Sequence, residues 1–132
     1  MLKKTFKQWL GANSKEKSIE KEPFPWIALD NTEQLNQFNI SGPDAVAVIF
    51  KHSTRCGISS MMLRRFESNW QHKDESMQCY LLDLIQYRSV SDAVAKQFNV
   101  LHQSPQVLVL KGGKLLEHES HGDISALHPN MF

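Results

Sequence analysis

The chain has 132 residues, of which 41% are hydrophobic and 22% are charged, and its formal net charge is +1 at pH 7. That length fits one domain with a buried core, and the balanced charge excludes the basic surface that marks nucleic-acid-binding domains. No apolar segment approaches the roughly 20 residues needed to cross a bilayer, and no signal peptide follows the first lysines, so we expect a cytoplasmic protein without a membrane partner.

The chain begins with a segment that has no usable periodicity. Residues 1–22, most of which are polar or charged, are predicted to form a flexible leader, and residues 23–132 a folded domain. A short strand is expected at 26–29, followed by a short helix that Asn31 or Thr32 caps. The apolar positions of this helix are Leu35, Phe38 and Ile40.

Two longer elements follow. Residues 45–50 are a continuous apolar run of strand length, which is typical of a strand buried on both faces of a sheet. After a polar loop, apolar side chains recur every four residues and predict a helix with one buried stripe. This stripe consists of Ile58, Met62, Leu63, Phe66 and Trp70.

The second half of the chain contains three further strands. Residues 77–85 predict the first of them, and Ser89 with Asp92 resembles a capping box that opens a helix. Residues 106–110 and 115–119 predict two strands joined by a Gly-Gly hairpin turn. The apolar face of the helix consists of Val90, Val94 and Phe98.

The order of these elements predicts the fold class. A last short helix, capped by Asp123, completes the order β-α-β-α-β-α-β-β-α. The early strands, which are joined through helices, should be parallel, whereas the final pair forms a hairpin. Helices packed on both faces of this mixed sheet give a three-layer α/β domain.

The loop KHSTRCGISS, residues 51–60, places Cys56 between the buried strand and the following helix. The free N–H groups of a helix N-terminus favour an anion at the sulfur, and Arg55 adds a positive charge. The Ser59 hydroxyl, one turn further on, could donate a hydrogen bond to a thiolate. These surroundings predict a nucleophile. A buried, inert cysteine is the alternative, and it describes Cys79 better; no disulfide is expected in a chain without an export signal.

Pro105 precedes the apolar run QVLVL, where a proline removes a hydrogen-bond donor from the sheet. A cis Ser104–Pro105 peptide bond would fit a tight turn at this point. A trans proline that merely begins the strand is the alternative.

The histidines are dispersed along the sequence. No spacing among them or the cysteines matches a four-ligand zinc motif, so no metal site is predicted. His52 and His102 lie in the loops expected to flank Cys56, where either could stabilise the thiolate or relay a proton. Surface histidines that bond to water are the alternative.

Several of these segments together resemble a known family. Cys-x-x-Ser at a strand-to-helix turn, and the stretch from Tyr80 to Leu116, are similar to thioredoxin-like chains. FKHSTRC, the following Ile-Ser and HQSPQ resemble the monothiol bacilliredoxin (YtxJ-like) group within that superfamily. The resemblance covers about residues 26–127 and implies a thioredoxin-like fold with Cys56 as the nucleophile.

The resemblance also assigns roles to other residues. Ser59 stands where a resolving cysteine would be, and Pro105 would be a cis-proline that faces the sulfur. The main chain of Ser104 would pair with the bound substrate, which Thr54 and His102 would also contact. The supporting residues would be His52, Arg55, Gly57 and Ser59. Two departures are Gly57, where family members often have proline, and Phe50, where thioredoxins have a buried aspartate.

The function implied by the resemblance is monothiol thiol–disulfide exchange. Such a protein removes a low-molecular-weight thiol, here bacillithiol as co-substrate, from S-thiolated client proteins, and it holds no tightly bound cofactor. Cys-Gly-Ile-Ser also resembles the Cys-Gly-Phe-Ser of monothiol glutaredoxins, which carry a [2Fe–2S] cluster between two subunits. A third possibility is a thioredoxin-fold adaptor whose cysteine has no catalytic role.

Overall fold

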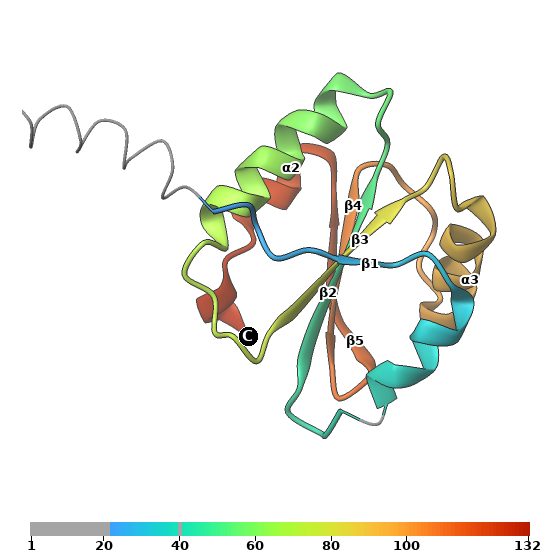
Figure 1. Cartoon of the computed structure of the whole chain (residues 1–132), viewed down its shortest axis with the longest axis vertical. Coiled ribbons are helices and arrows are strands. Elements are labelled where there is room, and N and C mark those ends of the chain that lie inside the picture. Colours follow the sequence, from blue (N-terminus) through green and yellow to red (C-terminus); the bar gives the residue numbers. More distant parts are fainter. Residues whose placement is uncertain (1–21, 40) are drawn as a thin grey trace, which may run out of the picture.

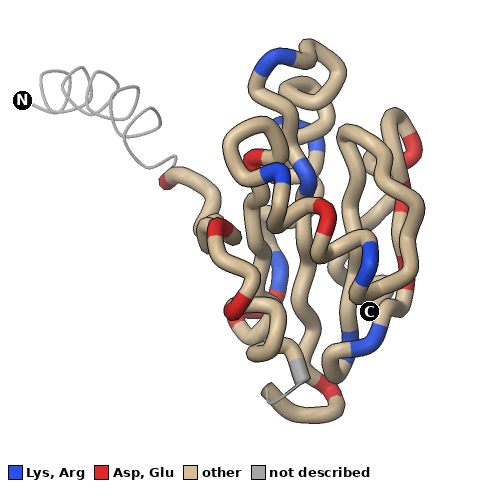
Figure 2. Tube along the Cα trace, turned by 90° about the vertical axis from the view of Figure 1, so that its right-hand side faces the viewer, with Lys and Arg blue, Asp and Glu red and all other residues tan. Residues whose placement is uncertain are grey.

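The computed structural model of the protein describes residues 22–39 and 41–132. Most of the predicted leader, residues 1–21, and the predicted apolar position Ile40 lie outside the described residues. Within the described part of the chain, no helix is long and apolar enough to cross a membrane. Figure 2 shows Lys and Arg residues interspersed with Asp and Glu along the chain trace.

Five strands form one mixed sheet at the centre of the domain (Figure 1). They are β1 (Ile27–Ala28), β2 (Val46–His52), β3 (Gln78–Asp83), β4 (Gln106–Lys111) and β5 (Lys114–Ser120). Their order across the sheet is β1-β3-β2-β4-β5. β2 is parallel to β3 and antiparallel to β4, and β4 forms a hairpin with β5. The predicted parallel early strands and the final hairpin are therefore confirmed, while β4 runs antiparallel to the early strands although α3 joins it to β3.

Helices cover both faces of this sheet, with α2 and α3 on opposite sides of it (Figure 1). The α-helices are α2 (Gly57–Asn69) and α3 (Arg88–Phe98), and the 3₁₀ helices are η1 (Thr32–Asn39), η2 (His121–Ala126) and η3 (Pro129–Met131). η2 packs beside α2 on the same side of the sheet, where the Asn69 side chain donates a hydrogen bond to the Ser125 carbonyl. The predicted three-layer α/β fold is confirmed.

The side chains of β2 alternate between two hydrophobic cores, since successive residues of a strand point to opposite faces of a sheet. Val48 and Phe50 lie in the core beneath α2, which also contains the stacked rings of Phe66 and Trp70. Ile49 lies in a mainly aliphatic core beneath α3 and η1. Every residue of β2 is buried, as a central strand covered on both faces requires.

The first turn of α2 differs from the predicted stripe. From Met62 onward the stripe packs into the core, but the side chain of Ile58 is 53% exposed. Ser59 is buried in its place, because position 59 lies on the same helix face as Met62 and meets His52 of β2. The prediction that Ile58 is a core residue is therefore wrong.

Two predicted helix caps are also wrong. α3 begins one residue before Ser89, so that Ser89 lies inside the helix. The turn that precedes α3 is already closed by the Asp83 carboxylate, which accepts hydrogen bonds from the N–H groups of Ile85 and Gln86. η2 begins two residues before Asp123, which places this carboxylate within its first turn rather than at its cap.

Candidate active site

Cys56 occupies the N-cap position of α2, and its side chain is partly exposed. Its N–H donates to the Ser53 carbonyl at 3.2 Å, and its carbonyl accepts from the Ser60 N–H at 3.1 Å. The sulfur makes no capping hydrogen bond within the described part of the chain. It therefore lies free at the positive end of the helix dipole.

Cys79 has the opposite surroundings. It lies on β3 in the core beneath α2, where its side chain is 1% exposed. Burial raises the pKa of the Cys79 thiol to about 12, although the charge of Lys73 acts in the other direction. Since the chain has two cysteines, Cys56 is the one that a disulfide in solution can reach.

The hydroxyl of Ser59 is directed toward His52. Ser59 is fully buried, and its Oγ accepts a hydrogen bond from the Ser53 N–H at 3.0 Å. The same oxygen lies 2.7 Å from Nδ1 of His52. The hydrogen bonds of this oxygen are thus with Ser53 and His52, whereas the sequence predicts one with the sulfur of Cys56.

His52 is the last residue of β2, and its side chain is buried. The prediction from the sequence that His52 lies in a loop is therefore wrong, and so is the alternative of a surface histidine. Burial lowers the pKa of His52 below its ordinary value, while the charges of Asp83 and Glu67 act in the opposite direction. The ring is therefore neutral near neutral pH. Nδ1 of the neutral ring shares a hydrogen bond with Oγ of Ser59, and the tautomer sets which of the two atoms donates.

The loop before β4 reaches the same end of the sheet. The Ser104–Pro105 peptide bond is cis, and Pro105 is buried. The register pairs Lys51 of β2 with Gln106 of β4, so Pro105 lies at the level of His52 and on the same face of the sheet. The Ser104 hydroxyl is buried and has no hydrogen-bond partner among the described residues.

His102 is not brought to Cys56. Its Nδ1 lies 3.3 Å from Nζ of Lys51 and 3.4 Å from Oγ of Ser91, on the α3 face of the sheet. Lys51, which is fully buried, is not among the site residues predicted from the sequence. The available signal was its position directly after the apolar run of β2, where the strand continues for two polar residues.

The other predicted site residues surround Cys56. Thr54 and Arg55 are exposed in the turn between β2 and α2, and Gly57 is the first residue of α2. A β-carbon on Gly57 would meet no atom within 4 Å, so space does not require a glycine there. Large apolar side chains are exposed nearby on α2, at Ile58 and Met61.

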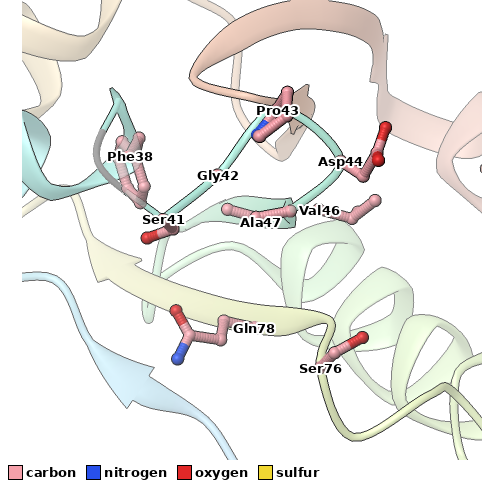
Figure 3. A pocket seen from close by; sticks show the side chains of 10 residues that line it. Phe38, Ser41, Gly42, Pro43, Asp44, Val46, Ala47, Ser76 and Gln78 are labelled. Carbon is pink, nitrogen blue, oxygen red and sulfur yellow. The ribbon is translucent and has the colours of Figure 1, made fainter.

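A separate pocket lies at the opposite end of the sheet, where β2 and β3 begin. It is lined by residues that include Phe38, Gly42, Asp44 and Gln78 (Figure 3). Cys56 follows the other end of β2, so this pocket is not part of the candidate site. Within the described residues, no group of three or more His, Cys, Asp and Glu side chains is arranged to hold a metal ion.

Comparison with known proteins gives a consistent result. The family model described as monothiol bacilliredoxin BrxC matches residues 27–128. A solved protein with a thioredoxin fold, to which an oxidoreductase role has been ascribed, is 30% identical over 79% of this chain and 87% of its own, with a TM-score of 0.65. The thioredoxin of Trypanosoma brucei brucei is 19% identical over 80% of this chain and 88% of its own, with a TM-score of 0.60. The thioredoxin of Malassezia sympodialis is 20% identical over 79% and 85%, with a TM-score of 0.59, so these two show a shared fold.

Proposed function

The chain belongs to the monothiol bacilliredoxin family, and on that premise we propose that it is a monothiol thiol–disulfide oxidoreductase that removes a low-molecular-weight thiol from client proteins. The family and the thioredoxin fold together support a thiol–disulfide redox function. The observation that carries the proposal is the pair of positions at the start of α2. Cys56 is partly exposed at the N-cap, and the buried residue one turn later is Ser59, which cannot form a disulfide.

The reaction has two exchange steps. In the first, the Cys56 thiolate attacks the small-thiol sulfur of a mixed disulfide; the bond to the client breaks, and the client leaves as a thiolate. A new disulfide then joins Cys56 to the small thiol. In the second step, the thiolate of another small thiol attacks the small-thiol sulfur of this adduct. The products are the symmetric small-thiol disulfide and the Cys56 thiolate, so the client sulfur is reduced and the one free small thiol that enters in the second step is oxidised.

The residues around Cys56 supply activation and binding in this scheme. The N-terminal N–H groups of α2 and the charge of Arg55 would stabilise negative charge that develops at the sulfur during exchange. The main chain of Ser104, with Pro105, would hold the disulfide beside the sulfur. Thr54 and the exposed side chain of Ile58 would contact the client.

Phe50 supports a monothiol route. It is fully buried and packs between the rings of Trp26, Phe66 and His52, so this position offers no carboxylate to assist a second thiol. We propose bacillithiol as the small-thiol co-substrate, S-thiolated proteins as clients and no tightly bound cofactor. A protein that depends on one free thiol requires a reducing compartment, so we propose the cytoplasm.

Intact-protein mass spectrometry after exposure to bacillithiol disulfide tests the proposal. The wild type should gain the mass of one bacillithiol, Cys56→Ser should gain none, and the matched variant Cys79→Ser should behave as wild type. If the Cys56→Ser variant still gains the mass of one bacillithiol, the proposal is wrong. Visible absorbance of protein purified without oxygen would instead favour the alternative of a [2Fe–2S] cluster carrier.

A further inference from the structure

A buried lysine on the α3 face of the sheet lies next to the loop that precedes Pro105. We infer that Lys51 and His102 are positioning residues, and that the hydrogen bond between them holds residues 101–104 in the conformation that the client disulfide requires. This inference rests on the proposed function, because it concerns the same substrate and the same loop. It gives His102 a role through Lys51 instead of a contact with the thiolate.

The geometry defines which group donates in this pair. Lys51 is fully buried between β3 and β4, and its Nζ lies 3.3 Å from Nδ1 of His102. An ammonium has three donors and no acceptor, so Nδ1 must accept and the ring must be neutral. The Ser91 hydroxyl, at 3.4 Å, approaches the same nitrogen from α3.

The charges around the pair favour this arrangement near neutral pH. Burial lowers the pKa of Lys51 to about 8, against the charge of Asp92, so the amine still carries its proton. The pKa of His102 is lowered by burial and by the charges of Lys51 and Arg88, while Asp92 acts in the other direction. A buried ammonium without a hydrogen bond is costly, and His102 supplies an acceptor for it.

A second contact holds the same loop. Gln106, which lies directly opposite Lys51 in the sheet, donates from Nε2 to the carbonyl of Leu101 at 3.0 Å. Two adjacent side chains on the α3 face therefore hold Leu101 and His102. Ser104 follows two residues later, where the chain turns to the cis-proline on the opposite face. A change in the Lys51–His102 bond would thus move the main chain that pairs with the substrate, without contact with Cys56.

Two variants of His102 separate the hydrogen bond from the side chain itself. His102→Leu removes the acceptor, whereas His102→Gln keeps an oxygen that can accept from Lys51. The measured quantity is a ratio of two rates. The first is the rate of exchange with a cysteine peptide that carries bacillithiol in a mixed disulfide, and the second is the rate at which iodoacetamide alkylates Cys56. We expect His102→Leu to lower this ratio by roughly tenfold, mainly through KM, and His102→Gln to retain it within about threefold. Because His102 is exposed, both variants should fold, which circular dichroism checks.

The pH profile provides a readout that a purely structural role would not change. As the pH falls through the lowered pKa of His102, the ring gains a proton, loses its acceptor and repels Lys51. The exchange-to-alkylation ratio of the wild type should fall in that range, and that of His102→Gln should stay level. His52 also has a lowered pKa but lies on the other face and is unchanged in this variant. Arg88 and Asp92, the charged groups that face the pair from α3, are likewise unchanged.

Three results would overturn the inference while the wild type still exchanges normally. They are equal ratios in His102→Leu and His102→Gln, an acid loss that persists in His102→Gln, and an NMR titration in which Lys51→Met leaves the pKa of His102 unmoved. We expect Lys51→Met to raise this pKa, because the variant removes the charge that lowers it. If the wild type shows no exchange at all, the proposed function fails, and this inference fails with it.

Discussion

Lys51 and His52 are consecutive residues of β2, yet they act on opposite faces of the sheet. His52 contacts Ser59 on the α2 face, one turn after Cys56, whereas Lys51 contacts His102 on the α3 face. Burial is the main cause of the lowered pKa of each. One strand end therefore has two roles, since it contacts the start of α2 on one face and the loop before Pro105 on the other.

The two faces also differ in their packing, and this difference gives the largest predicted effect. Phe66 on the α2 face is fully buried, and its ring centroid lies 4.8 Å from that of Trp70 and 5.5 Å from that of Trp26. We expect Phe66→Ala to lower the free energy of unfolding by about 3–5 kcal/mol, because it removes a buried ring and leaves a cavity. Urea denaturation would measure the change.

The matched variant on the α3 face is Phe98→Ala. Phe98 is 9% exposed, and its ring lies 6.3 Å from that of Phe38, a looser contact than those of Phe66. Its effect should therefore be at or below about 3 kcal/mol, the lower end of that range. Equal losses for the two variants would show that the aromatic cluster gives the α2 face no extra stability.

Ser59→Ala would break the contact on the α2 face. The variant leaves Nδ1 of His52 and the N–H of Ser53 without a partner in a buried place. We expect a loss of about 1–3 kcal/mol in the free energy of unfolding. The alkylation rate of Cys56 should change little, since the hydroxyl is directed to His52. A large fall in alkylation at unchanged stability would mean that the hydroxyl acts on the sulfur after all.

Lys51→Met would break the contact on the α3 face. Burial lowers the pKa of Lys51 from 10.5 to about 8, so between these values the unfolded chain binds more protons than the folded protein. The stability of the wild type should thus rise with pH across this window, and the full cost of the buried ammonium is present below it. We expect Lys51→Met to lack this slope and to be more stable at neutral pH by on the order of 1–2 kcal/mol, a figure reduced for solvent screening. Parallel curves of stability against pH for the two proteins would contradict this expectation.

The sequence predicts the layers of this fold well and the contacts at the end of the sheet near Cys56 poorly. Apolar runs and helical periodicity identify the strands and the helices because burial on a face is a local pattern. The contacts that Lys51, His52 and His102 make depend on the register between β2 and β4, which are far apart in the sequence. A shift of one residue would exchange the faces of Lys51 and His52.

The reversal of Ile58 and Ser59 has a similar cause. Both positions lie within one turn of Met62 on the helix surface, so periodicity alone permits either to be buried. The tertiary partner decides between them, since Ser59 meets the ring of His52 and Ile58 is left 53% exposed. A hydrophobicity pattern favours isoleucine for that place because it contains no information about the histidine beneath the helix.

Gly57→Pro gives the smallest effect and tests how α2 begins. Gly57 is the first helical residue, a position at which proline is favoured because the N–H there has no partner within the helix. Cys56 has φ −107 and ψ 120, an extended conformation that a residue before proline readily adopts. Proline should therefore raise the free energy of unfolding by about 0.4–1 kcal/mol, because it restricts the unfolded chain. The control Gly57→Ala fits the available space and keeps the N–H. If both variants fold normally and only proline slows the alkylation of Cys56, the N–H of Gly57 helps to hold the thiolate. The need for this N–H would then explain why position 57 is not proline, which packing does not explain.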